Sequence, residues 1–305
     1  MPHNVIFRPV FNRPEMLQLS IDYEAEARKT GDIQDNEYTT WFLVEHGAPE
    51  KVHEIVENYP FPSVRLYRNR WWRSGEKKRY GISRNLLEGM KKGFPTADNH
   101  GIVIEDDILI HKSYFNYITA VLNAIGDINY SVISATGYRN DSSNCSIVST
   151  KPRHFSPLAP LISKPFWNNY IRPYSKSSYY QNRKKTVARL NTAYKSNWDK
   201  EYKFNDSTTY NNHDGLINRL VDVAYIEEKR LMLTPEVSRQ MHIGIYGLNN
   251  KSKPIPGNSY HERLDALRKI VLDNRLKEFN NSNVIPEKGF RKELDSWNGM
   301  IDLRQ

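Results

Sequence analysis

The sequence predicts an α/β fold, with a doubly wound and mostly parallel sheet whose strands alternate with helices. In the first half of the 305 residues, short apolar runs alternate with segments whose apolar residues recur at helical spacing. Residues 101–105 (GIVIE) are apolar almost throughout, as in strands buried on both faces of a parallel sheet. We therefore expect right-handed β-α-β units, with the residues that follow each strand gathered at one edge of the sheet.

The individual elements follow from the same patterns. Residues 4–8 predict the first strand, and a helix follows with Asn12 as its N-cap, Pro14 in its first turn and its end near Gly31. The other expected strands are 40–45, 64–67, 101–105, 131–135 and 231–233. The other expected helices are 49–59, 82–90, 113–125, 214–223 and 259–279. Residues 172–212, rich in Tyr, Asn, Lys and Ser, predict a partly ordered insertion or lid.

Composition narrows the function only slightly. Lys and Arg exceed Asp and Glu by 44 − 35 = 9, a balance that suits an anionic ligand but also occurs on proteins without an acidic partner. Cys145 is the single cysteine, which excludes an intrachain disulfide and a cysteine-based zinc site. We see no signal peptide and no apolar run of about 18 residues, so we expect a cytoplasmic protein without a transmembrane segment.

Three consecutive carboxylates, Glu105, Asp106 and Asp107, follow the most apolar of the expected strands. Neighbouring negative charges repel one another and are costly to bury unpaired. A divalent cation would remove that cost, and oxygen ligands suit Mn²⁺ or Mg²⁺, with diphosphate oxygens completing the shell. A solvated acidic turn or a helix N-cap is the alternative. The strand before the triplet and the helix expected after it favour the metal site.

Two further polar segments each allow a functional and a structural interpretation. Asp214, preceded by His213 at the start of an expected helix, could act as a general base or simply cap the helix, and spacing alone favours the cap. Arg239 or His242, in a glycine-containing segment, could contact a phosphate or lie in a surface turn.

A basic cluster lies at residues 65–79, where seven basic residues, Arg73 among them, occur with one acidic residue and surround Trp71 and Trp72. Cations interleaved with aromatic rings are typical of surfaces that bind sugars, nucleotides or single strands. A solvated basic loop explains the same residues equally well. Residues 179–194 contain a second patch of this kind.

The order of five segments resembles the inverting, metal-dependent glycosyltransferases of the GT-A fold, most closely the family of N-acetylglucosaminyltransferase I and its O-mannose-linked relative. The segments are IVIEDDILIHKSYF, SATGYRN, FSPLAPLISKPFW, NNHDGLINRLV and LTPEVSRQMHIG. The resemblance spans residues 4–250, and its most specific parts are the carboxylate triplet and the PEVSR…HIG segment. The first hundred residues match in pattern only.

This resemblance implies transfer of a sugar from a UDP-sugar to an acceptor hydroxyl, with inversion at the anomeric carbon. It implies Asp107 as the direct Mn²⁺ (or Mg²⁺) ligand of a DXD-type motif and Asp214 as the catalytic base. The residues that it places at the donor are Arg13, Glu45, His46, Arg84, Glu105, Asp106 and His242. Trp71, Trp72 and Arg73 are candidates for the acceptor, by their composition alone.

The sequence also departs from that family. His213 stands where a second acid is usual, and the acidic residue of Glu45–His46 is displaced by one position. We expect residues 1–255 to form the glycosyltransferase domain, with 1–135 as the nucleotide-sugar half and 136–255 as the acceptor and catalytic half. A C-terminal helical arm is expected over 256–305. Without the family's Golgi anchor and disulfides, a cytoplasmic enzyme of bacterial, phage or viral type is expected.

Four functions remain open at this point. The first is a glycosyltransferase whose acceptor is a saccharide or a glycolipid. The second has the same chemistry with hydroxylated bases of DNA as acceptor, suggested by the net charge and by Trp71–Trp72 within a basic segment. The third is a metal-dependent nuclease, although the sequence has no dense set of His and Asp ligands around the triplet. The fourth is a binding module without catalysis.

Overall fold

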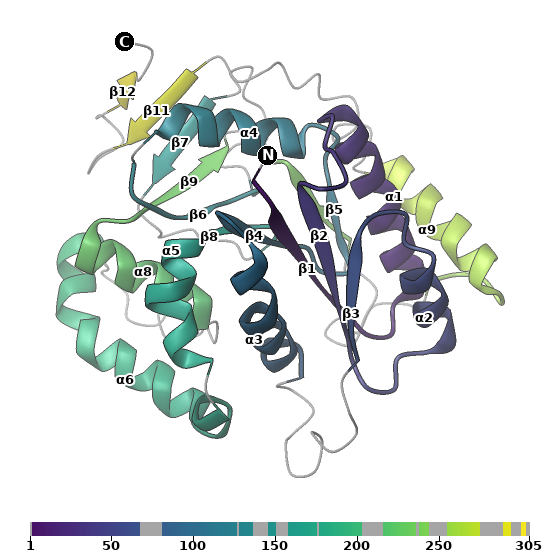
Figure 1. Cartoon of the computed structure of the whole chain (residues 1–305), viewed down its shortest axis with the longest axis horizontal. Coiled ribbons are helices and arrows are strands. Elements are labelled where there is room, and N and C mark those ends of the chain that lie inside the picture. The colour runs from purple at the N-terminus through teal and green to yellow at the C-terminus, as the bar shows by residue number, and fades with distance from the viewer. Residues whose placement is uncertain are drawn as a thin grey trace.

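The computed structural model describes residues 2–67, 81–126, 128–136, 146–150, 158–175, 177–202, 216–235, 238–243, 255–274, 289–293 and 300–302. In this part of the chain, one 10-stranded sheet has the order β12-β11-β7-β9-β6-β8-β4-β1-β2-β3, and β10 and β5 form a second, two-stranded sheet (Figure 1). Five of the nine strand pairs described for the large sheet are parallel. The α/β class and the mostly parallel sheet are therefore confirmed.

The N-terminal half consists of the predicted β-α-β units. Its strands are β1 (Asn4–Val10), β2 (Tyr38–Val44), β3 (Ser63–Tyr67) and β4 (His100–Val103), and all of their mutual pairings are parallel. The connecting helices are α1 (Pro14–Thr30), α2 (Glu50–Glu57) and α3 (Gly81–Gly93), which a 3-10 turn (Phe94–Thr96) extends. Each element lies within a few residues of its expected position, because apolar spacing in this half is regular.

The C-terminal half adds six strands to the large sheet in the described residues, and some of their pairings are antiparallel. The strands are β6 (Tyr130–Ile133), β7 (Ser146–Thr150), β8 (Leu161–Ser163), β9 (Leu231–Pro235), β11 (Gly289–Glu293) and β12 (Met300–Asp302). Only β6 and β9 correspond to expected strands. Because β8 runs antiparallel between β4 and β6, it joins the two halves into one sheet.

The remaining helices cover this second half and one flank of the first. They are α4 (Tyr114–Ile125), α5 (Lys164–Phe166), a π-helical turn (Trp167–Ile171), a 3-10 turn (Arg172–Tyr174), α6 (Ser177–Tyr202), α8 (Leu216–Glu228) and α9 (Tyr260–Asn274). Within the expected insertion 172–212, residues 177–202 form one continuous helix of 26 residues packed against α8. None of the helices in the described ranges is both long and apolar enough to cross a membrane.

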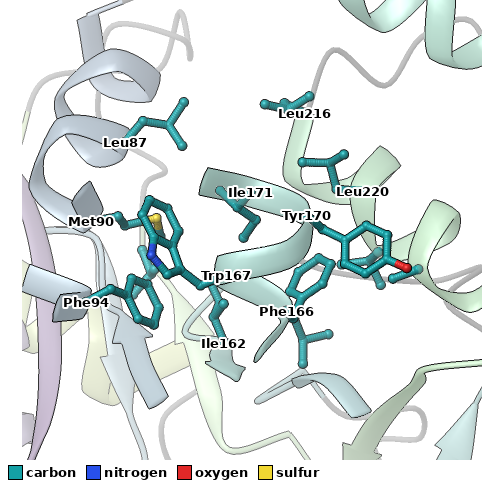
Figure 2. Packing of buried hydrophobic residues seen from close by; sticks show 14 of the residues in the cluster. Leu87, Met90, Phe94, Ile162, Phe166, Trp167, Tyr170, Ile171, Leu216 and Leu220 are labelled. Atoms are coloured by element: carbon teal, nitrogen blue, oxygen red, sulfur yellow. The ribbon is translucent and has the colours of Figure 1, made fainter. Parts of the chain in front are cut away.

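Side chains of the central strands alternate between two cores, as the pleat requires. Phe7 belongs to the core under α3 and α8, whereas its neighbour Ile6 faces the core under α4. Figure 2 shows the first core, where the rings of Trp167 and Phe94 stack with centroids 4.7 Å apart and Met90 of α3 packs beside them. These two cores hold the parallel strands rigidly from both sides.

A third buried cluster is polar. On α1, Glu24 accepts hydrogen bonds from Arg8 of β1 (Nε to Oε2, 2.9 Å) and from Arg28 (Nε to Oε1, 2.9 Å), and the Tyr59 hydroxyl donates to the same carboxylate at 2.7 Å. The side chains of Arg8 and Glu24 have no solvent exposure. Burial would raise the pKa of Glu24, but the two guanidinium groups outweigh it and lower that pKa. This cluster ties α1 to β1 of the sheet.

The start of α1 corrects one prediction. Pro14 occupies the first turn and Gly31 follows the last, as expected, but the N-cap is Arg13 and not Asn12. Arg13 makes no side-chain cap bond to the helix. Its side chain binds carboxylates elsewhere, and this tertiary interaction outweighs the local preference for Asn at the cap.

Candidate functional site

The carboxyl ends of β1, β2 and β4 meet at one edge of the sheet, as predicted from parallel β-α-β units. The Ile104 amide donates to the carbonyl of Phe7 at 2.9 Å, which holds the segment after β4 beside β1. The Glu45 amide donates to the carbonyl of Val10 at 3.0 Å, which holds the segment after β2 on the other side of β1. The segments that contain Arg13, Glu45 and the carboxylate triplet therefore lie next to one another.

The triplet leads into a strand and not into a helix, so the helix-cap interpretation is wrong. Strand β5 (Ile108–Ile110) begins directly after Asp107 and pairs antiparallel with β10 (Gln240–His242). The Ile243 amide donates to the Asp107 carbonyl at 2.9 Å. This pairing brings His242, 135 positions further along the chain, against the triplet.

Arg13 and His242 converge on the last two carboxylates. The Arg13 guanidinium donates through Nη2 to Oδ1 of Asp106, and through Nη1 to Oδ2 of Asp107 at 2.5 Å. Nε2 of His242 lies 3.1 Å from the same Oδ2 of Asp107. The other carboxylate oxygen, Oδ1 of Asp107, is buried without a hydrogen-bond partner in the described part of the chain.

The pKa values of the three acids shift in different directions. Burial, followed by the charges of Asp107 and Asp106, raises the pKa of Glu105 to about 7. Burial also raises the pKa of Asp106 to about 6, against the opposing charge of Arg13. For Asp107, burial is outweighed by the hydrogen bond to His242 and the charge of Arg13, so its pKa is lowered. Asp107 is therefore the member of the triplet that is most firmly anionic.

The donor set fits a metal held through one protein carboxylate. Among the residues that the structure describes, no group of three His, Cys, Asp or Glu side chains could hold a metal together. The three side chains of the triplet therefore do not converge on one point as a set of three metal ligands. The unpartnered Oδ1 of Asp107 is nevertheless a hard anionic oxygen of the kind that Mn²⁺ and Mg²⁺ prefer, with other ligands left to diphosphate or water oxygens.

Three other predicted donor residues lie at the same end of the sheet. Glu45 and His46 follow β2, and Glu45 is largely buried. Arg84 lies on α3 beside Asn85, whose amide donates to the carbonyl of Leu43 near the end of β2 at 2.7 Å. The roles of these residues toward a donor stay predictions.

The remaining candidates divide into two groups. Trp71, Trp72, Arg73, His213 and Asp214 lie outside the described residues. Arg239 is described, and it is 1% exposed with its guanidinium 5.5 Å from the ring centroid of Tyr117. Its packing in the core disfavours the phosphate contact considered for it, which leaves His242 as the phosphate candidate of that segment.

Sequence reasoning missed the contacts that hold the His242 segment in place. The Gln240 side-chain amide donates to the Thr136 hydroxyl at 3.1 Å, and the backbone amide of Arg239 donates to the Ala135 carbonyl at 2.7 Å. Both partners follow β6. A polar residue after an apolar strand, Thr136, was the sequence feature that could have predicted these contacts. The end of β6 thus supports the same edge as β1, β2 and β4.

Comparisons with known proteins give a weak likeness of fold. No protein-family model matches the chain, and no curated protein matches it. Among solved structures, it is similar to TarS 1–349 of S. aureus (TM-score 0.41, 11% identity, covering 55% of this chain and 48% of that one). It is also similar to the mannosyltransferase PcManGT from Pyrobaculum calidifontis, solved with GDP-Man and Mn²⁺ (TM-score 0.37, 9% identity, covering 55% and 46%).

A third similar structure covers a larger share of the chain. It is 4-diphosphocytidyl-2C-methyl-D-erythritol synthase from Anaerococcus prevotii (TM-score 0.40, 11% identity, covering 88% of this chain and 98% of that one). The chain spans about half the length of the first two structures. All three TM-scores lie below 0.5, so a function for this chain has to be argued from the site itself.

Proposed function

We propose that the protein is a metal-dependent, inverting glycosyltransferase that moves a sugar from a UDP-sugar to an acceptor hydroxyl. The observation that carries this proposal is the Asp107 carboxylate at the carboxyl edge of the parallel strands. One of its oxygens is buried and unpartnered, and the other is bound by Arg13 and His242. One open anionic oxygen beside a guanidinium and an imidazole suits a diphosphate together with its divalent cation.

The residues around the triplet have separate roles toward the nucleotide sugar. A divalent cation bound at Oδ1 of Asp107 would supply charge neutralisation for the departing diphosphate. Arg13 and His242 donate to phosphate oxygens, because a guanidinium and an imidazole are the donors nearest to that carboxylate. The carboxyls of Glu105 and Asp106 are left to accept from hydroxyls of the donor ribose and sugar.

Base recognition and acceptor activation involve residues further from the triplet. Glu45 would read the uracil edge, and its backbone amide, bonded to the Val10 carbonyl, keeps it at the same edge of the sheet. Asp214 removes the proton of the acceptor hydroxyl as its oxygen attacks the anomeric carbon, the bond to UDP breaking on the opposite face. A saccharide or glycolipid is the proposed acceptor.

The Asp214→Asn variant tests the assignment of the base. Loss of general-base catalysis is expected to lower the turnover of a UDP-sugar, measured as UDP released with acceptor present, about a hundredfold. Binding of UDP in the presence of Mn²⁺, measured by titration calorimetry, should be unchanged. Asp265→Asn is the matched control, since Asp265 lies on α9 with a side chain that is 66% exposed. Turnover like that of the control would contradict the assignment.

A DNA acceptor is the second candidate, favoured by the net charge of +9 and by the tryptophan pair within residues 65–79. Retention of duplex DNA at low salt, with binding that weakens steeply as salt rises, would support it. No retention at low salt would exclude it. A two-metal nuclease has less support, since no cluster of three ligands occurs in the described ranges.

A further inference from the structure

We propose that Arg13 is an exchangeable internal cation, which bridges Asp106 and Asp107, competes with the divalent metal, and thereby makes metal binding depend on the nucleotide. This inference rests on the proposed function. It concerns how the same site is regulated, and not which reaction the site performs.

The first argument is the geometry of the guanidinium. Its two terminal nitrogens bind different carboxylates, so one side chain bridges Asp106 and Asp107. A divalent cation beside these acids would compensate the same negative charges. Oδ2 of Asp107 is shared by Arg13 and His242, which leaves only Oδ1 open to a metal. A metal on Oδ1 would lie close to the positive charge of the Arg13 guanidinium. Repulsion between the two cations would weaken the binding of the metal.

The second argument is that the Arg13 side chain can leave while its backbone stays. The Arg13 carbonyl accepts from the Leu17 amide at 2.9 Å, which fixes the backbone at the start of α1. The side chain makes no cap bond to the helix. It is 22% exposed, against 4% and 5% for the side chains of Asp106 and Asp107, so it reaches the acids from the solvent side.

The third argument is that a nucleoside diphosphate offers the Arg13 guanidinium an alternative anionic partner. The planar guanidinium binds phosphate oxygens as well as it binds carboxylates, and often through two parallel bonds. When Arg13 transfers to the diphosphate, Asp107 loses its nearest cation and becomes a better metal ligand. Each ligand therefore favours the binding of the other, and this coupling is reciprocal.

The test measures Mn²⁺ binding directly, without turnover. Wild-type protein is titrated with Mn²⁺ and the free ion is followed by electron paramagnetic resonance, with and without UDP. We expect wild-type protein to bind Mn²⁺ at least tenfold more tightly when UDP is present. Arg13→Gln should bind Mn²⁺ alone at least tenfold more tightly than wild type does, and UDP should then enhance binding much less.

Two variants keep this test interpretable. Arg263→Gln is the matched control. Arg263 of α9 forms an ion pair with Glu15 of α1, the helix that begins after Arg13, and the Arg263 side chain is 35% exposed. It should behave as wild type. Arg13→Lys keeps the charge without the planar fork and should show an intermediate affinity for Mn²⁺. If thermal denaturation shows that Arg13→Gln is unfolded, the Mn²⁺ affinity of Arg13→Lys compared with that of wild type tests the exchange.

The negative outcomes separate the two proposals. If wild type binds Mn²⁺ and the Arg13 variants bind it equally tightly or more weakly, the exchange is overturned and the metal-dependent function stands. If no variant binds Mn²⁺ even with UDP present, metal dependence fails and the exchange fails with it.

Discussion

Replacing Asp107 with asparagine is expected to lower the rate of sugar transfer about a thousandfold. The substitution preserves the shape of the side chain but removes the negative charge. It replaces the carboxylate whose Oδ1 is open to a metal with a neutral amide, and it leaves Arg13 and His242 facing a neutral group. Metal stabilisation of a departing phosphate is worth several kcal/mol, which corresponds to about three powers of ten in rate.

The measurement is UDP release from a saturating UDP-sugar, with Mn²⁺ and acceptor present. Asp265→Asn again serves as control, because it makes the same chemical change on an exposed surface. Thermal unfolding of both variants separates loss of function from loss of fold. An Asp107→Asn enzyme that retains more than a tenth of the wild-type rate would show that this carboxylate does not hold the leaving group's cation.

The Glu24→Gln substitution is expected to cost about 3–5 kcal/mol in the free energy of unfolding. Glu24 is fully buried between Arg8 and Arg28, and a neutral side chain leaves two buried guanidinium groups without a counter-charge. Asp22→Asn is the matched control on α1. Its ion pair with Arg268 is about 40% exposed on each side and should contribute about 1 kcal/mol or less. Urea denaturation measures both, and a loss below 1 kcal/mol for Glu24→Gln would contradict the account.

The same carboxylate sets a dependence of stability on pH. The pKa of Glu24 is lower in the folded protein than in the unfolded chain, so its contribution is fully present above the unfolded value of about 4.3. That contribution is lost as the pH falls through the folded value. Wild-type stability should therefore drop in acid by more than that of Glu24→Gln. Parallel curves for the two proteins below about pH 5 would contradict this expectation.

The N-terminal half was predictable because its signals are local. Short apolar runs mark β1 to β4, and apolar residues at helical spacing mark the helices between them. The topology of parallel sheets then places the triplet at the edge where ligands bind. In contrast, β8 has three residues and β7 has five, and both acquire their place from non-local antiparallel pairing. No pattern within so short a segment specifies its partner strand.

The residue types of the candidate site and its edge of the sheet were predictable, but the contacts between its side chains were not. The sequence singled out Asp107 and His242 separately, but their contact depends on the β5–β10 pairing across 135 positions. Propensity favoured Asn12 as the cap of α1, whereas the ion pairs of Arg13 with two carboxylates decide the local structure. Sequence patterns report local preference, and the site is built from long-range electrostatics.

The central claim is that Asp107 anchors the cation of the departing nucleotide. A crystal structure with Mn²⁺ and UDP tests it most directly. The account predicts manganese bonded to the Asp107 carboxylate and to both phosphates of UDP, with the Arg13 guanidinium moved from Asp107 to the diphosphate. Manganese and UDP bound away from Asp107, with the bridge from Arg13 to both carboxylates intact, would contradict it.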